Sequence, residues 1–191
     1  LHGIEIAKPK PTVKKYRTVK DAILDLPELD NGDAPDITKY SRVAESTYAK
    51  LMRRKLDQCG NNVVTNNAQH IVNRYSHIPQ GGNWEDIPKR LMKNYADVTR
   101  CHTGIYRRLK EDEPSVVIGN FRKNMLVHPW QNRGLSVREA ARLQSIPDWF
   151  RFTGSIGFQQ QQVGNLVPPL LAKAVFKQIF SLCDPQDNLG Q

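Results

Sequence analysis

Cysteine and histidine are the side chains of this sequence best suited to act as nucleophiles, bases or metal ligands. The three cysteines are odd in number and widely spaced, and no two of them form a C-x-x-C pair. This pattern favours a reducing compartment such as the cytoplasm over a disulfide scaffold. Neither cysteine nor carboxylate accompanies the histidines at a ligand spacing, so no metal site is expected. The residues concerned are Cys59, Cys101, Cys183, His70, His77 and His102.

A surplus of cations is the second chemical feature. The 191 residues contain 28 Lys and Arg against 19 Asp and Glu, a net charge of +9. The cations are spread along the chain, so the charge is expected on folded surfaces, where it suits a polyanionic partner. No apolar run is long enough to cross a membrane, and no secretory leader opens the chain.

Capping signals and apolar spacing predict the elements that must position these residues. A helix is expected over 18–29, with Thr18 as its N-cap and Asp21 three residues on. Another is expected over 44–58, with Gly60 at its C-terminal cap, and a short one over 84–92. Two short strands are expected at 113–121 and 125–129.

The clearest helix signal is SVREAARLQSI, residues 136–146, where Ser136 and Glu139 have the spacing of a capping box. A final apolar helix is expected over 170–182, because Pro168 and Pro169 suit the first turn of a helix.

Two segments resemble conserved blocks of DNA cytosine-5 methyltransferases. They are RGLSVREAARLQSIPDWFRFTG at 133–154 and QQVGNLVPPLLAKAVF at 161–176. YRTVKDAILDLP, residues 16–27, is similar to the segment that follows the catalytic core of that family. RYSHIPQGGNWEDIP and YRRLKEDEPSVVIGNF are similar to a bacterial target-recognition region. The resemblance implies methyl transfer from S-adenosylmethionine to carbon 5 of cytosine in duplex DNA.

Several motifs of that family are missing from the sequence. It has no Gly-rich cofactor-binding turn, no Glu-Asn-Val and no Gln-x-Arg-x-Arg, and none of its cysteines follows a proline. The chemistry requires a thiolate nucleophile and an acid acting on a flipped cytosine. The isolated chain is therefore expected to carry no catalytic residue and to be inactive.

The resemblance also implies that Asn165 and Leu166 form one edge of the S-adenosylmethionine site, although a simple turn before the final helix would have the same sequence. Gly164 and the two prolines are interpreted as structural, as is His128. Glu139 is expected to organise an internal network. Arg138 is left open between that network and a DNA phosphate.

A DNA-facing surface is expected over the recognition region and the start of the first conserved block. Arginine, asparagine and glutamine can read base edges, and most basic contacts go to phosphates. Gly81 and Gly82 would let a loop approach a groove, or would simply form a turn. The candidates are Arg74, Gln80, Gly81, Gly82, Asn83, Arg107, Arg108, Arg122, Lys123, Asn124, Arg133 and Arg138.

The expected fold class is α+β, with a small irregular target-recognition domain that contains short strands and is flanked by helices. The final helix is expected to belong with an absent α/β methyltransferase core. The predicted divisions are an extended segment with helices at 1–59, the recognition domain at 60–132, the conserved blocks and final helix at 133–183, and a tail at 184–191.

The expected partners are duplex DNA and a catalytic core, in a cytoplasmic, nucleoid-associated bacterial system such as restriction-modification. Because the sequence opens at Leu1, it is expected to be a piece of a longer enzyme; the smaller subunit of a split methyltransferase is the other arrangement. A stand-alone sequence-specific DNA-binding module is the alternative of a different class.

Overall fold

The computed structural model describes residues 7–93, 95 and 102–183. In chain order they form α1 (Val19–Ile23), β1 (Ile37–Lys39), α2 (Thr47–Arg53), β2 (Gln58–Gly60) and α3 (Gln69–Tyr75). Two 3-10 turns follow, η1 (Trp84–Asp86) and η2 (Lys89–Leu91). The remaining helices are α4 (Phe121–Asn124), α5 (Val137–Leu143), α6 (Ile156–Asn165) and α7 (Pro169–Cys183).

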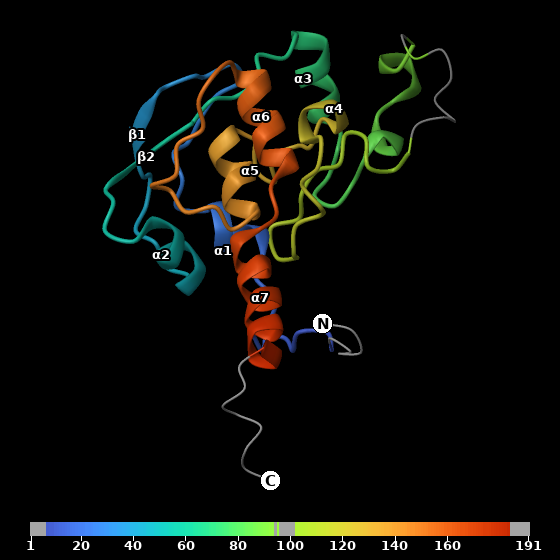
Figure 1. Cartoon of the computed structure of the whole chain (residues 1–191). Helices are drawn as coiled ribbons and strands as arrows, with labels where there is room; N and C mark the ends of the chain where they lie inside the picture. The colour runs from blue at the N-terminus through green and yellow to red at the C-terminus, as the bar shows by residue number, and fades with distance from the viewer. Residues whose placement is uncertain (1–6, 94, 96–101, 184–191) are drawn as a thin grey trace.

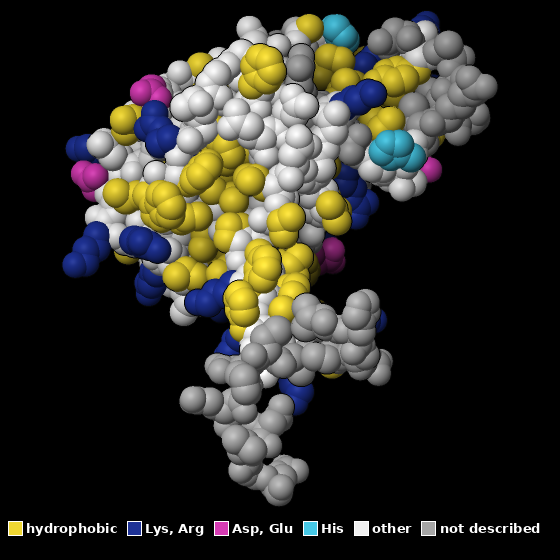
Figure 2. All heavy atoms as spheres, viewed as in Figure 1, with side chains coloured by type: hydrophobic (Ala, Val, Ile, Leu, Met, Phe, Trp, Pro, Cys, Tyr) yellow, Lys and Arg dark blue, Asp and Glu magenta, His cyan; other side chains and the backbone are white. Residues whose placement is uncertain are grey.

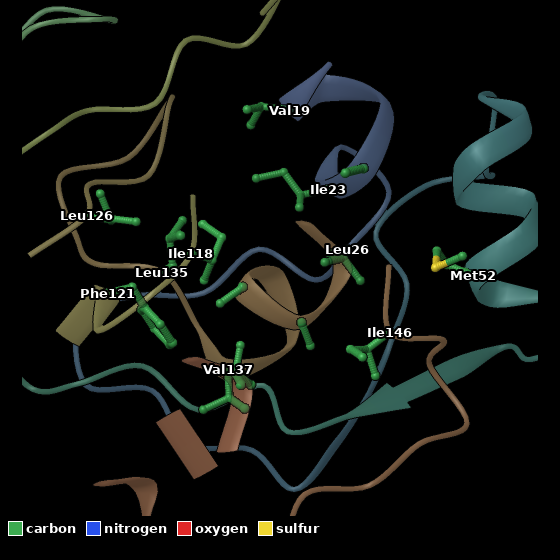
Figure 3. Close-up of a cluster of buried hydrophobic side chains, with 14 of the residues drawn as sticks. Val19, Ile23, Leu26, Met52, Ile118, Phe121, Leu126, Leu135, Val137 and Ile146 are labelled. Carbon is green, nitrogen blue, oxygen red and sulfur yellow. The ribbon is translucent and has the colours of Figure 1, made fainter. Parts of the chain in front are cut away.

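Helix α5 lies at the centre of the body, with α1 and α6 packed beside it (Figure 1). Its alanine-rich side allows this close packing, because Ala140 and Ala141 are fully buried. A first cluster of buried side chains surrounds α5 and includes Ile23, Phe121 and Val137 (Figure 3). A second cluster joins α3 to the segments around Tyr106 and Val127.

Local capping explains two of the helices as predicted. Thr18 and Asp21 form a capping box at the start of α1, and Ser136 and Glu139 form one at the start of α5. In each box the two residues satisfy each other's free backbone amides. The helix expected over 18–29 is shorter than predicted, because α1 ends at Ile23. The final helix is also confirmed, with Pro169 in its first turn.

The strand predictions are wrong in position. Among the described residues the only sheet pairs β1 with β2, antiparallel, with Thr38 opposite Cys59. Residues 113–119 take no regular structure, and Val117 is 93% exposed because no neighbouring strand covers it. Val127 makes only isolated bridges to Arg108 and Gly134. The mixed α+β class holds, but the described part of the recognition region contains no extended strand.

Three helix predictions also need correction. Helix α2 ends at Arg53 with Arg54, at a φ of 54°, as its C-cap, while Gly60 lies in β2. Pro88 divides the helix expected over 84–92 into η1 and η2. Helix α6 was not expected, because its glutamine run lacks apolar periodicity, although Val163 and Gln160 are buried.

Candidate functional site

Arg142 on α5 holds three separate segments together. It donates two hydrogen bonds of 2.6 Å to Asp148, one of 3.0 Å to Asp25 and one of 2.9 Å to the carbonyl of Ala22. Burial by itself would lower the pKa of Arg142, but the two carboxylates raise it above its ordinary value. This charged centre fixes α1 and the 147–148 turn against α5.

Arg138, one turn before Arg142, is fully buried as well. Its guanidinium donates to the carbonyls of Gly60 (2.8 Å) and Phe150 (2.6 Å) and to the side chain of Asn61. Burial lowers the pKa of Arg138. No part of this side chain reaches the surface, so the phosphate role is replaced by a structural one.

Arg133 and Glu139 form a buried bidentate pair with N–O distances of 2.7 and 2.9 Å. Burial tends to raise the pKa of Glu139, but Arg133, His128 and the Ser136 amide together lower it to about 2. Arg133 also donates to the carbonyl of Leu29. The expectation that Arg133 contacts DNA is therefore corrected, whereas the internal role expected of Glu139 agrees with these contacts.

His128 completes this network as a neutral imidazole. Its Nδ1 accepts from the backbone amides of Trp130 and Gln131, so the proton lies on Nε2, 3.5 Å from Glu139. Burial lowers the pKa of His128 to about 4, although Glu139 acts in the opposite direction. Its structural interpretation agrees with these contacts.

Two arginines of the recognition region are also internal. Arg108 donates to the carbonyls of Tyr75 (2.7 Å), Ile78 (2.6 Å) and His128 (2.7 Å). Arg74 donates to the carbonyl of Leu91 and to the hydroxyl of Tyr106. Both are buried and serve to organise the second cluster, so their DNA-contact roles are corrected.

The Gly-Gly loop is a turn tied to a neighbouring segment. Gly81 has a φ of +79°, which favours glycine, and a Cβ on Gly82 would meet Pro79 and Asp86. The loop exchanges backbone hydrogen bonds with Arg108. Asn83 is buried and caps η1 by accepting from the Glu85 amide. These contacts favour the turn interpretation over a groove-reading loop.

A smaller set of polar side chains remains at the surface. Gln80 and Lys123 are exposed and Arg107 is half-buried. The sequence interpretation did not include Lys89 and Arg90 among the candidates for DNA contact, although both are exposed on η2. The sequence signal for them was a pair of adjacent cations after Pro88. The side chains of Arg122 and Asn124 lie outside those that the structure describes.

The expected cofactor edge lies at the end of α6. Asn165 is exposed there, and Leu166 is half-buried at the C-cap. Asn165 lines a pocket of about 270 Å³ whose other walls are glycines and the amide side chains of Asn120, Gln160 and Gln161. This lining offers hydrogen bonds but no charge to pair with an amino-acid carboxylate or ammonium. The described residues of this pocket could therefore hydrogen-bond a cofactor but could not neutralise its charged groups.

Gly164 has a different role from the expected turn. It lies inside α6, and a Cβ there would stand 2.6 Å from the carbonyl oxygen of Gly119. The glycine is needed for close packing of α6 against the 119–120 segment.

Helix α7 extends away from the body (Figure 1), and several of its apolar side chains are exposed. Leu171, Phe176 and Phe180 are 54%, 55% and 65% exposed, and Figure 2 shows hydrophobic side chains along the helix. The Leu170 amide donates to Ser145 at the base of the helix. Surfaces of this kind mark interaction sites in soluble proteins.

Comparison with known proteins identifies the family. The model of the C-5 cytosine-specific DNA methylase family matches residues 7–181. The chain belongs to this family. It is 37% identical over 181 residues to the type II methyltransferase M1.HphI of Haemophilus parahaemolyticus, covering 94% of this chain and 41% of that protein. The type II methyltransferase M.Eco47II of Escherichia coli is 37% identical over 189 residues, covering 95% and 39%.

The fold also resembles a solved structure. A crystal structure of a putative DNA modification methyltransferase encoded within an E. coli prophage superposes with a TM-score of 0.67 at 21% identity. The match covers 91% of this chain and 49% of the other. This chain thus spans less than half the length of each of these three proteins.

The described part of the chain contains one free cysteine. Cys59 is buried in β2, and burial raises the pKa of its thiol to about 11. A thiol with this pKa stays protonated at neutral pH and is a poor nucleophile. Cys101 and the side chain of Cys183 lie outside the described residues.

Within the described residues, no helix is long and apolar enough to cross a membrane. The same part of the chain holds no group of three His, Cys, Asp or Glu side chains arranged for a metal ion.

Proposed function

We propose that this chain supplies the DNA-recognition and carboxy-terminal part of a DNA cytosine-5 methyltransferase. It works with a methyltransferase core that carries the nucleophile, either in the same polypeptide or as a separate subunit. By itself the chain binds duplex DNA and transfers no methyl group. The uncovered apolar side of α7 is the observation that carries this proposal, together with the family match over 7–181.

Helix α7 is the docking element in this proposal. Leu171, Phe176 and Phe180 would lose most of their exposed area against the core, which stabilises the pair by about 25 cal/mol per Å² of apolar surface removed from water. A stand-alone DNA-binding module, the alternative, has no use for such a side. The helix also brings the end of α6 to the core, so that Asn165 completes the S-adenosylmethionine site there.

S-adenosylmethionine, when bound, supplies the methyl group that the core transfers. The part of this chain is to hold one edge of the cofactor through Asn165 and Leu166 and to close that edge to water. No proton transfer is assigned to the described residues of this chain, because the ionisable groups nearest the centre of the fold are committed to internal ion pairs.

DNA is held by the exposed polar residues of the recognition region. Gln80, Arg107 and Lys123 remain the candidates from the sequence, joined by Lys89 and Arg90. Arg122 and Asn124 stay candidates on sequence alone. The domain boundaries at 59/60 and 132/133 also remain predictions.

Two measurements test the proposal. First, binding of a fluorescent duplex is followed as salt rises; each phosphate contact contributes about −0.9 to the slope of log K against log salt. The variant Arg107→Gln should flatten that slope, whereas Arg54→Gln, at the exposed end of α2 and outside the predicted recognition domain, should leave it unchanged. Absence of binding at low salt would refute the DNA role.

Second, the chain is mixed with a core from a relative, a duplex and labelled cofactor. Methyl transfer should require both chains. Phe176→Glu should abolish complementation, because it places a charge on the docking side, while Lys177→Gln, which changes the charge equally, should not. Transfer by the chain alone would refute the division of labour, and equal effects of the two variants would refute docking through α7.

A further inference from the structure

The amide of Gln160 on α6 is buried with one end unpaired. The side chain is 4% exposed, and its Nε2 donates to Thr65 Oγ1 at 2.9 Å. Its Oε1 has no hydrogen-bond partner among the described residues. A threonine hydroxyl both donates and accepts, so turning the amide over would leave the nitrogen unpaired instead. In either orientation, one buried polar atom requires a partner.

Gln160 lines the pocket at the end of α6 and also a second pocket of about 220 Å³. Only the second pocket is lined by its partner Thr65 as well. Its apolar wall includes Tyr75, Phe121 and Leu126; Figure 3 shows the last two among the buried side chains of the first cluster. The volume is below the roughly 300–1,000 Å³ of sites for drug-sized ligands and above the ~150 Å³ that holds a benzene ring. The pocket therefore suits a single ring system.

Among the side chains that the structure describes, none that lines this pocket is charged, so it does not suit a phosphate or a carboxylate. Its ligand must be neutral, with apolar faces and a hydrogen-bond donor for Gln160. Lys123 is exposed on the short α4, between the lining residues Phe121 and Met125. A nucleotide requires a neutral pocket for its base and a nearby cation for its phosphate, and Lys123 is an exposed cation that lies between two lining residues in sequence.

The backbone of the pocket wall is also constrained. Met125 has a φ of 51°, in the left-handed region that residues other than glycine seldom adopt. Such conformations persist where the surrounding structure holds them, and they occur often at ligand sites. Here the positive φ turns the chain from α4 into the segment that carries Leu126.

We propose that this pocket holds an unstacked nucleobase of DNA that carries an exocyclic amino group. The amine donates to Oε1 of Gln160, the faces of the ring lie against the apolar wall, and Lys123 contacts the adjoining phosphate. This inference rests on the proposed DNA binding by the chain. It adds a specific base-holding element to that function.

The test compares two duplexes of equal sequence, one fully paired and one with a single bulged adenine, bound to the whole 191-residue chain. Stacking and one hydrogen bond should make the wild-type chain prefer the bulged duplex by about tenfold. Gln160→Met, which keeps the length of the side chain and removes the amide, should reduce the preference to about twofold without weakening binding of the paired duplex. Gln162→Met, two residues on at an exposed position of α6, is the matched control and should retain the tenfold preference.

The outcomes separate the two proposals. Equal affinity of the wild-type chain for both duplexes would overturn the proposal that the pocket holds a base, while leaving DNA binding intact. It would indicate that an ordered water is the partner of the Gln160 amide. A preference that survives Gln160→Met would also overturn it. Binding to neither duplex would overturn the proposed function itself.

A wild-type measurement covers the case in which Gln160→Met does not fold. With 2-aminopurine as the bulged base, entry into the pocket should change its emission on binding. The emission of a 2-aminopurine held in the paired duplex should not change. Equal emission changes in the two duplexes, or none in either despite binding, would overturn the pocket. Free adenosine added at millimolar concentration should compete only weakly, because it lacks the phosphate contacts; full displacement by it would assign the pocket to a free nucleoside.

Discussion

Replacing Glu139 by glutamine removes the counter-charge of a buried arginine while preserving side-chain shape. In the native chain, Glu139 receives two charge-assisted hydrogen bonds from Arg133 and one of 2.7 Å from the Ser136 amide. Glutamine would turn its NH2 group toward Arg133 or toward the Ser136 amide, and both are donors. The guanidinium of Arg133, which is almost fully buried, would then lack a compensating charge.

The expected cost of Glu139→Gln is about 3–5 kcal/mol, the usual effect of removing one partner from a buried ion pair. This is a large fraction of the roughly 5–15 kcal/mol by which a domain is stabilised. Glu28→Gln is the matched control, because Glu28 pairs with Arg42 at 3.7 Å on the surface, and it should cost less than about 1 kcal/mol.

Urea unfolding of the three proteins, followed by circular dichroism, measures both costs, provided that the slopes agree. The double variant Arg133→Met, Glu139→Leu should be more stable than Glu139→Leu alone, since it leaves no uncompensated charge. The reasoning is refuted if Glu139→Gln costs no more than Glu28→Gln, or if the double variant is less stable than the single one.

Three further predictions concern other parts of the network and packing. His128 has a pKa of about 4, so its contribution to the free energy of unfolding should be complete above about pH 6.5 and lost as the pH falls toward 4. Glu139 has a pKa of about 2, so its contribution should be lost between about pH 4.5 and 2. Urea unfolding at several pH values should show this fall, and His128→Asn, which keeps an acceptor for the two amides, should flatten its upper part. Gly164→Ala should lower the midpoint of thermal unfolding, because its Cβ would lie 2.6 Å from a carbonyl oxygen, whereas Gly119→Ala, with open space around its Cβ, should change it little; similar shifts would contradict the packing argument. Iodoacetamide at pH 7.5, mapped by mass spectrometry, should modify Cys59 only after denaturation, and rapid labelling in the folded chain would contradict its burial.

The sequence was sufficient where the deciding contacts are local. Both capping boxes join residues three apart, so Thr18 with Asp21 and Ser136 with Glu139 could be identified from spacing alone. The family motifs also lie in short continuous segments, which is why the two conserved blocks led to the same family as the match over 7–181. The apolar final helix followed from its composition and its leading prolines.

Tertiary structure alone decided which cations are free to meet DNA. Arginine has the same five donors whether it binds a phosphate or internal carbonyls, so residue type could not separate Arg107 from its buried neighbour Arg108. The deciding partners are distant: Arg138 reaches Gly60 and Arg142 reaches Asp25, 78 and 117 residues away. The β1–β2 pairing and the unpaired amide of Gln160 likewise depend on segments that meet only in the folded chain. The spacing of neighbouring residues carries no information about such contacts, because they join residues that are distant in sequence and meet only when the whole chain folds.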